Sequence, residues 1–345
     1  MRNQIRLGSP SHFAGVRRNL ARRYLLTTVA LIPAVFGCAL AQTNPVIAGN
    51  SPQPFRLAFA RKRTHATYTY ETRSWLFTMD SDGRNVRDLK LEGFSPSWSP
   101  DGNRIAFSSS KDEPRAEVYV CNADGSHTQR LTHLRGGAGA DRPVWSPDGK
   151  QIAFSSFVGK LPEIFVVDID GSEPKKLTGG GGISPSWSPD GKKIVFASAR
   201  GGSLQLYWTN ADGTGVAQLT TVKPGASEPA WSPDGNKILY TVTGLQSEST
   251  IGILDVPSGK TSRFAYSDKF NFFSPAWSPD SKMVLMELSG KGGFVVWSPD
   301  PYEPPAEKAI GWKHQIFAMT IDGALSRQLT KADDGGTQPS AGKMP

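Results

Sequence analysis

Cysteine and histidine are scarce in this sequence. Its 345 residues include two cysteines and five histidines, which excludes a disulfide-dense scaffold and a cysteine-rich zinc site. The four histidines after residue 41 occur in no paired metal-ligand spacing. The Gly-x-Ser-x-Gly motif of hydrolases and the phosphate-binding glycine loop of nucleotide enzymes are also absent. We therefore expect no catalytic residues and no protein-ligated metal site.

The body of the chain also lacks an excess of charge of either sign. The formal net charge is +8, but six of the 39 basic residues are arginines within residues 1–41, which contain no acidic residue. The remainder has 33 basic and 31 acidic residues. A nearly neutral body offers no electrostatic surface for DNA or RNA, so we expect no nucleic-acid partner.

The first 41 residues have the pattern of a secretory signal. Four arginines between residues 17 and 23 precede an apolar run of 17 residues, 24–40, and small residues Ala39 and Ala41 flank its end. The length of the run is at the short limit of a membrane span, so an uncleaved N-terminal anchor is the alternative. We predict a signal peptide or anchor helix over 1–41, a linker over 42–55 and a folded domain over 56–345.

A repeat dominates the rest of the sequence. Trp-Ser-Pro-Asp recurs with spacings of 47, 42, 44 and 46 residues, at Trp98, Trp145, Trp187, Trp231 and Trp277. Each copy is followed by an alternating apolar strand, a turn with Asp-Gly or its equivalent, and usually a Leu-Thr pair. A period in the forties with four short strands, a to d, is typical of a β-propeller blade. We expect the tryptophan, at the end of strand a, to pack between neighbouring blades.

The number of blades follows from the hairpins between strands c and d. Six such turns are present, at Asp82, Asp124, Asp170, Asp212, Ser258 and Asp322. Only five strands a carry the tryptophan, and the first blade lacks one. Residues 337–341 follow Leu329-Thr330 as residues 227–231 follow Leu219-Thr220. We therefore predict an all-β, six-bladed propeller of four-stranded antiparallel blades, closed by the C-terminal strand, with Ala341 in the tryptophan position. Trp297 falls out of phase, in an insertion over residues 289–313.

These repeats resemble the WD-like propeller repeats of the TolB type, on the strength of the five Trp-Ser-Pro-Asp turns and their paired hairpins. The resemblance spans about residues 56–341. It implies a periplasmic protein of the cell envelope. The family's envelope member carries an additional α/β domain before its propeller, and about 14 residues between Ala41 and Arg56 leave no room for one here. Similar repeats occur in propellers of prolyl-oligopeptidase-type enzymes and of lyases that act on pectic oligosaccharides.

The propeller geometry indicates where a binding site lies. The a–b and c–d turns are short and repetitive, whereas the b–c and d–a connections vary and meet on the opposite, loop face. Strand a is innermost, so the residues before its proline should surround the channel mouth. These are Ser95, Arg142, Ser184, Glu228, Ser274 and Gln338, preceded by Phe94, Asp141, Ile183, Ser227, Phe273 and Thr337.

Our candidate binding residues come from this face. They are Arg142, Asp141, Glu228, Gln338, His133, Phe94 and Phe273. Arg142, Asp141 and Glu228 interrupt a column of small or apolar residues, and two interpretations stand side by side. They bind a charged group or sugar of a partner, or they form ion pairs with each other across a wet channel.

The functional hypothesis is an exported, non-catalytic propeller that acts as a protein-interaction scaffold in a periplasm. The partner would be an envelope protein or peptide, and we expect a monomer without a cofactor. The alternative is a carbohydrate-binding or lyase-like propeller that uses the charged channel mouth for an acidic oligosaccharide. Whether a cation such as Ca²⁺ occupies the channel is left open.

Overall fold

The structure is a computed structural model. It describes residues 52–63, 73–134, 139–243, 249–266, 270–290, 314–323, 326–330 and 336–344. The chain divides into two units, Met1–Gly49 and Asn50–Pro345, and the described residues belong to the second. The predicted leader, most of the predicted linker and Trp297 lie outside them. Within these ranges, no helix has the length and apolar character needed to cross a membrane.

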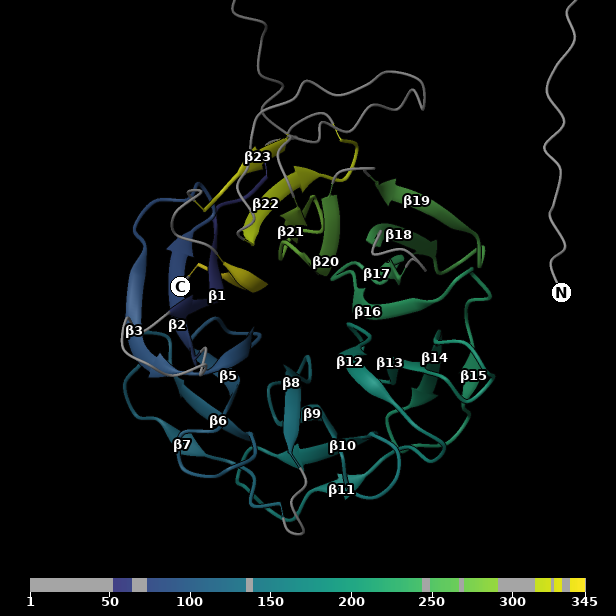
Figure 1. The fold of residues 1–345 in the computed structure, drawn as a ribbon, viewed down its shortest axis with the longest axis horizontal. Helices are drawn as coiled ribbons and strands as arrows, with labels where there is room; N and C mark the ends of the chain where they lie inside the picture. The colour runs from purple at the N-terminus through teal and green to yellow at the C-terminus, as the bar shows by residue number, and fades with distance from the viewer. Residues whose placement is uncertain are drawn as a thin grey trace, which may run out of the picture. The chain divides into compact units, whose positions relative to one another are not determined.

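The described residues of the second unit form six four-stranded antiparallel sheets, arranged as blades around one axis (Figure 1). The innermost strands line a channel on this axis. This confirms the predicted propeller. From the channel outward, blades one to six contain the following strands: β24 (Thr337–Lys343), β1 (Phe55–Arg63), β2 (Arg73–Asp80), β3 (Arg87–Glu92); β4 (Phe94–Trp98), β5 (Arg104–Ser109), β6 (Glu117–Asn122), β7 (Gln129–Arg130); β8 (Ala140–Trp145), β9 (Gln151–Ser156), β10 (Glu163–Asp168), β11 (Lys175–Lys176); β12 (Ile183–Trp187), β13 (Lys193–Ser198), β14 (Gln205–Asn210), β15 (Ala217–Gln218); β16 (Ala226–Trp231), β17 (Lys237–Thr243), β18 (Ser249–Asp255), β19 (Thr261–Ala265); β20 (Phe270–Trp277), β21 (Met283–Gly290), β22 (Gln315–Thr320), β23 (Ser326–Gln328).

The C-terminal strand completes the first blade, as predicted. β24 pairs with β1 in antiparallel register, and Ala341 lies opposite Leu57. Ala341 packs against the apolar cluster between blades six and one, at the position that the other blades give to tryptophan. The next residue, Gly342, lies against the ring of Trp98, where a Cβ atom would come within 2.4 Å of the indole. Glycine at this position therefore allows the chain end to cross the neighbouring blade.

The core is divided among the interfaces between blades. Six apolar clusters are present in the described residues, one at each contact of adjacent blades. Trp145 belongs to the cluster shared by blades two and three, and its Nε1 donates to the Ser97 carbonyl of blade two at 3.2 Å. Trp277 donates in the same way to Ala230 of blade five at 3.0 Å. The recurring tryptophan therefore joins neighbouring blades, as expected.

The Ser-Pro-Asp-Gly sequence forms the turn between strands a and b. In blade three, the Ser146 hydroxyl donates to Asp148 at 2.6 Å and accepts the Gln151 N–H at 2.9 Å. Gly149 has a φ of 69°, which favours glycine. Hydrogen bonds from Ser146 and from the Lys150 N–H lower the pKa of Asp148. The motif therefore closes each turn with its own side chains.

The threonine of the Leu-Thr pair after strand d forms hydrogen bonds to the start of strand c, a role that was not predicted from the sequence. The Thr178 hydroxyl accepts the Ile164 N–H at 2.9 Å and donates to the buried Glu163 carboxylate at 2.8 Å. The same bridge recurs in three other blades, between Thr132 and Glu117, Thr220 and Gln205, and Thr330 and Gln315. The threonine thus satisfies polar groups at the start of strand c inside the blade.

Candidate functional site

Each innermost strand contains one irregularity, directly before its proline. The pairing register between strands a and b shifts at this point in every blade. The residue before the proline has a left-handed φ, between 48° and 55°, although it is never glycine. Such a bulge redirects a side chain out of the regular alternation. The residues concerned, called the ring below, are Ser95, Arg142, Ser184, Glu228, Ser274 and Gln338.

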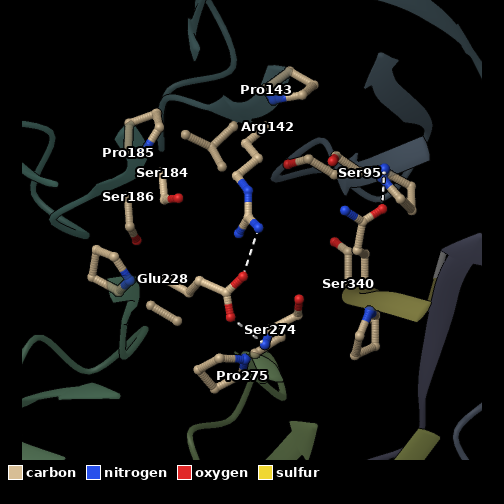
Figure 2. A pocket seen from close by; sticks show the side chains of 18 residues that line it. Ser95, Arg142, Pro143, Ser184, Pro185, Ser186, Glu228, Ser274, Pro275 and Ser340 are labelled. Carbon is tan, nitrogen blue, oxygen red and sulfur yellow. Dashed lines mark hydrogen bonds and ion pairs between the residues drawn. The ribbon is translucent and has the colours of Figure 1, made fainter. Parts of the chain in front are cut away.

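The ring separates two spaces on the axis of the propeller. The channel, about 180 Å³, is lined by three consecutive residues of each innermost strand, beginning with the ring residue (Figure 2). The vestibule, about 380 Å³, shares four ring residues with the channel and adds residues from the strand ends of the loop face. Its lining residues are Ser74, Phe94, Arg142, Glu228, Phe273, Ser274, Glu287, His314, Thr337 and Gln338.

Arg142 and Glu228 point toward each other across the ring (Figure 2). The guanidinium of blade three lies 2.6 Å from the carboxylate of blade five. The Arg142 side chain is 31% exposed and that of Glu228 is 15% exposed, so water reaches the pair only partly. Of the two interpretations of these charges, the ion pair across the channel is therefore present in the structure.

Further contacts hold the Glu228 carboxylate in place. Its Oε2 accepts the Ser274 N–H at 2.7 Å and the Thr241 hydroxyl at 2.9 Å. Burial on its own would raise the pKa of Glu228, but the Arg142 charge and these hydrogen bonds hold the pKa below its ordinary value. Burial would likewise lower the pKa of Arg142, and the carboxylates of Glu228 and Asp141 raise it instead. Both groups are therefore charged at neutral pH.

A second set of contacts fixes the opposite side of the ring. The Asp141 carboxylate accepts the Ser95 hydroxyl at 2.9 Å and the Arg142 N–H at 2.6 Å. The Gln338 side chain accepts the Ser95 N–H at 2.8 Å. Asp141 also lies 3.9 Å from the Arg142 guanidinium. Predicted residues from three separate blades are thus joined into one hydrogen-bonded network.

Glu287 and His314 also belong to the site, although neither was among the predicted residues. Glu287 accepts the Gln338 N–H at 3.0 Å and bonds through its other oxygen to His314 Nδ1. It lies opposite Phe273, at the strand-b position that Ser155 and Thr241 occupy in other blades. Those two hydroxyls also bond ring residues, Ser155 to the Ser184 N–H and Thr241 to Glu228. Alignment of the repeats at strand b would therefore have identified Glu287.

Of the other predicted residues, two lie in the vestibule and one lies on the outer surface. Phe94 and Phe273 are half-buried in the vestibule wall. His133 is exposed and is not among the lining residues of either space. It lies two residues after Leu131, near the outer end of the connection from β7 to β8, so the structure does not bring it to the channel rim. In the described ranges, no three His, Cys, Asp or Glu side chains are grouped to hold a metal ion.

The chain is similar in sequence and in structure to known β-propeller proteins. A family model described as the TolB beta propeller domain matches residues 54–301. The Tol-Pal system protein TolB of Thioalkalivibrio sulfidiphilus is 36% identical over 69 residues, which are 19% of this chain and only 16% of that relative's length. The crystal structure of TolB from Acinetobacter baumannii has a TM-score of 0.66 and 25% identity, over 84% of this chain and 67% of the other. The putative TolB from Agrobacterium tumefaciens has the same fold, with a TM-score of 0.60 and 19% identity, over 84% and 92%.

Proposed function

The chain belongs to the TolB β-propeller domain family, and we propose from this membership that it is an exported, non-catalytic scaffold that binds a partner protein in the cell envelope. The relative named as a Tol-Pal system protein supports an envelope location. The arginine-rich apolar leader, residues 1–41, supports export to the periplasm, with residues 24–40 as the segment that would anchor an uncleaved chain.

The state of the carboxylates around the ring supports binding rather than catalysis. Asp141, Glu228 and Glu287 each accept hydrogen bonds from protein groups on neighbouring strands. A general acid or base needs a carboxyl group that reaches the substrate, whereas these groups are engaged in holding the ring. A preformed wall of this kind loses little conformational entropy when a partner binds.

The partner would enter the vestibule from the loop face. Phe94 and Phe273 offer half-buried aromatic surfaces on opposite sides of the Gln338 strand, and aromatic side chains in a desolvated pocket are typical hot spots of protein interfaces. The ring charges below them would orient the partner segment. We propose that the aromatic residues contribute most of the affinity and that the charges select the partner.

A pull-down from an envelope fraction tests this proposal. The tagged full chain should retain a specific envelope protein, and Phe273→Ala should release it, because the variant removes an aromatic contact without touching the ring. Ser184→Ala is the matched control, since the Ser184 side chain lies in the channel below the vestibule. Equal retention of the protein by wild type and Phe273→Ala would contradict the proposal.

The alternative function, binding of an acidic oligosaccharide, is favoured by one observation. The Arg142 guanidinium lies in the vestibule and remains charged, because its carboxylate neighbours raise its pKa. A sugar carboxylate would compete with Glu228 for this guanidinium. Binding of tri-galacturonate to the chain, lost in Arg142→Gln and retained in Phe273→Ala, would favour the sugar over a protein partner.

A further inference from the structure

A second surface lies on the connection between β9 and β10. Seven large apolar side chains of the described residues are exposed, and three of them lie in this one connection. Phe157 is 57% exposed, Val158 is 47% and Leu161 is 53%. Single exposed apolar residues are ordinary, but a group of them next to a depression marks an interaction surface.

The depression next to Leu161 is a groove between blades three and four. Its volume is about 160 Å³, and it shares no lining residue with the channel or the vestibule. Leu161 and Pro162 form the wall from blade three, and Ala199, Arg200 and Leu204 form the wall from blade four. The walls are mainly apolar, which suits a hydrophobic side chain.

Glycine forms the floor of this groove. Gly180, Gly181 and Gly182 cross from β11 to β12, and the first two have φ values of 87° and 92°. The Gly181 carbonyl accepts the Ser198 hydroxyl at 2.8 Å and an Arg200 guanidinium N–H at 2.8 Å. A Cβ atom on Gly180 would have no atom within 4 Å. Hydrogen bonds therefore hold the floor in position. Because glycine has no side chain, the space above the floor stays unfilled.

The rim of the groove is cationic. Arg200 bonds to Ser198 and Gly181 and stacks 5.0 Å from the Tyr207 ring centroid, but it has no acidic partner within the described residues. Lys160, between Val158 and Leu161, is exposed and has none there either. The Glu163 carboxylate is buried beneath Gly181, where it accepts from Thr178 and the Gly181 N–H and lies 3.5 Å from the Lys176 ammonium group. The surface therefore combines apolar walls with two uncompensated positive charges.

We infer that this groove binds an acidic, leucine-containing peptide segment of a partner protein, separately from the vestibule. One apolar side chain would fill the space over the glycine floor, and flanking carboxylates would pair with Lys160 and Arg200. An anionic membrane has matching charge and apolar character, but a flat lipid surface leaves a concave space between two walls unfilled. The geometry therefore favours a peptide, and binding to vesicles is a separate outcome of the test.

The experiment measures fluorescence anisotropy of a labelled 12-residue peptide with two leucines flanked by glutamates, titrated with the full chain. A peptide with glutamines in place of the glutamates should bind about tenfold more weakly, because it lacks the charges that pair with the rim. Lys160→Glu and Leu161→Asp should each weaken binding of the glutamate peptide by a similar factor. Lys175→Glu is the matched control, because Lys175 is an exposed lysine on the outer strand of the same blade.

The outcomes separate this inference from the proposed function. Phe273→Ala should leave peptide binding unchanged, so the groove remains testable if the vestibule binds nothing. Equal binding of the glutamate and glutamine peptides, or binding unaffected by Lys160→Glu and Leu161→Asp, would overturn the inference. It would also be overturned if only phosphatidylglycerol vesicles bound the chain and the same two variants abolished that binding.

Discussion

At the scale of single residues, the ring depends on backbone conformation as much as on side-chain chemistry. All six ring residues, none of them glycine, adopt left-handed φ angles, a conformation that costs about 1–2 kcal/mol for an ordinary residue. The cost is offset where ring N–H groups find acceptors, as those of Ser95, Ser184, Ser274 and Gln338 do. The bulge therefore both aims the side chain inward and frees an N–H group to bond to the preceding blade.

The Arg142–Glu228 pair should show strong coupling in a double-mutant cycle. Arg142→Ala leaves the largely buried Glu228 carboxylate without its counter-charge, and we expect it to lower the free energy of unfolding by about 2–3 kcal/mol. Arg142→Ala/Glu228→Ala should be destabilised by at least about 1 kcal/mol less than the sum of the single variants. Urea unfolding of the four proteins measures this, and Ser184→Ala serves as an uncharged ring control. Additive single effects would contradict an energetically coupled pair.

Some features of the ring could be predicted from the sequence, and others could not. The six ring positions follow from the phase of the Trp-Ser-Pro-Asp repeat. In every strand a, the ring residue lies three positions before the tryptophan, or before Ala341 in the first blade. The sequence leaves the pairing of Arg142 with Glu228 as one of two interpretations of these charges, because it does not show how far apart blades three and five lie across the channel. His314 stands at the start of β22 after a long insertion, where no repeat phase applies. The prediction that His133 lies at the channel rim did not account for its place in the connection from β7 to β8. This connection begins at the outer edge of the blade, and His133 lies near that end.

At the scale of elements, the tryptophan that ends strand a should matter most where it is fully buried. Trp145 lies between blades two and three and is 6% exposed. We expect Trp145→Ala to lower the free energy of unfolding by about 3–5 kcal/mol, because it leaves a cavity between the blades and removes the bond to Ser97. Trp231 is half-buried and stacks on Trp208. Trp231→Ala should cost about 2 kcal/mol, and a larger loss for Trp231 than for Trp145 in urea unfolding would contradict this account.

The Ser-Pro-Asp turns should make stability dependent on acid. Hydrogen bonds from Ser99 and the Asn103 N–H lower the pKa of Asp101, and equivalent bonds lower that of Asp190. A carboxyl group with a lowered folded-state pKa stabilises the fold above its unfolded pKa of about 3.9 and loses this contribution as the pH falls through the folded value. Asp101→Asn keeps an acceptor oxygen but cannot titrate, so its melting temperature should fall less than that of wild type between pH 6 and pH 3. An identical acid dependence for both proteins would show that the turn carboxylates do not contribute.

The strands of each blade were predictable, but their internal bridges were not. Alternating apolar residues and Asp-Gly turns define strands b, c and d locally. The bridge from Thr178 to Glu163 joins residues 15 apart in sequence, and nothing in either residue alone indicates it. Only the comparison of four blades shows that a threonine at the end of strand d accompanies a Glu or Gln at the start of strand c.

At the scale of the whole molecule, the propeller is closed by pairing between β24 and β1. Removal of the chain after Thr330 would expose the edge of β1 and the apolar cluster between blades six and one. We expect this truncation to lower the melting temperature by about 10 °C or more, because several kcal/mol of interface are lost. Differential scanning calorimetry measures the change, and removal of Met344 and Pro345, which follow the last strand, is the control. A melt equal to that of the intact chain would contradict a stabilising role for the closure.

Closure has a consequence for the order in which the molecule is built. Blades two to six are each made from one continuous stretch of sequence, so each can form without any distant segment of the chain. The first blade needs residues 337–343 beside β1, so it can be completed only after the segments of blades two to six are present. Until then, β1 presents an unpaired edge, which exposes the folding chain to chaperones, proteases and aggregation. A chain that lacks residues 337–343 therefore has an open ring, with the edge of β1 available for pairing with another chain.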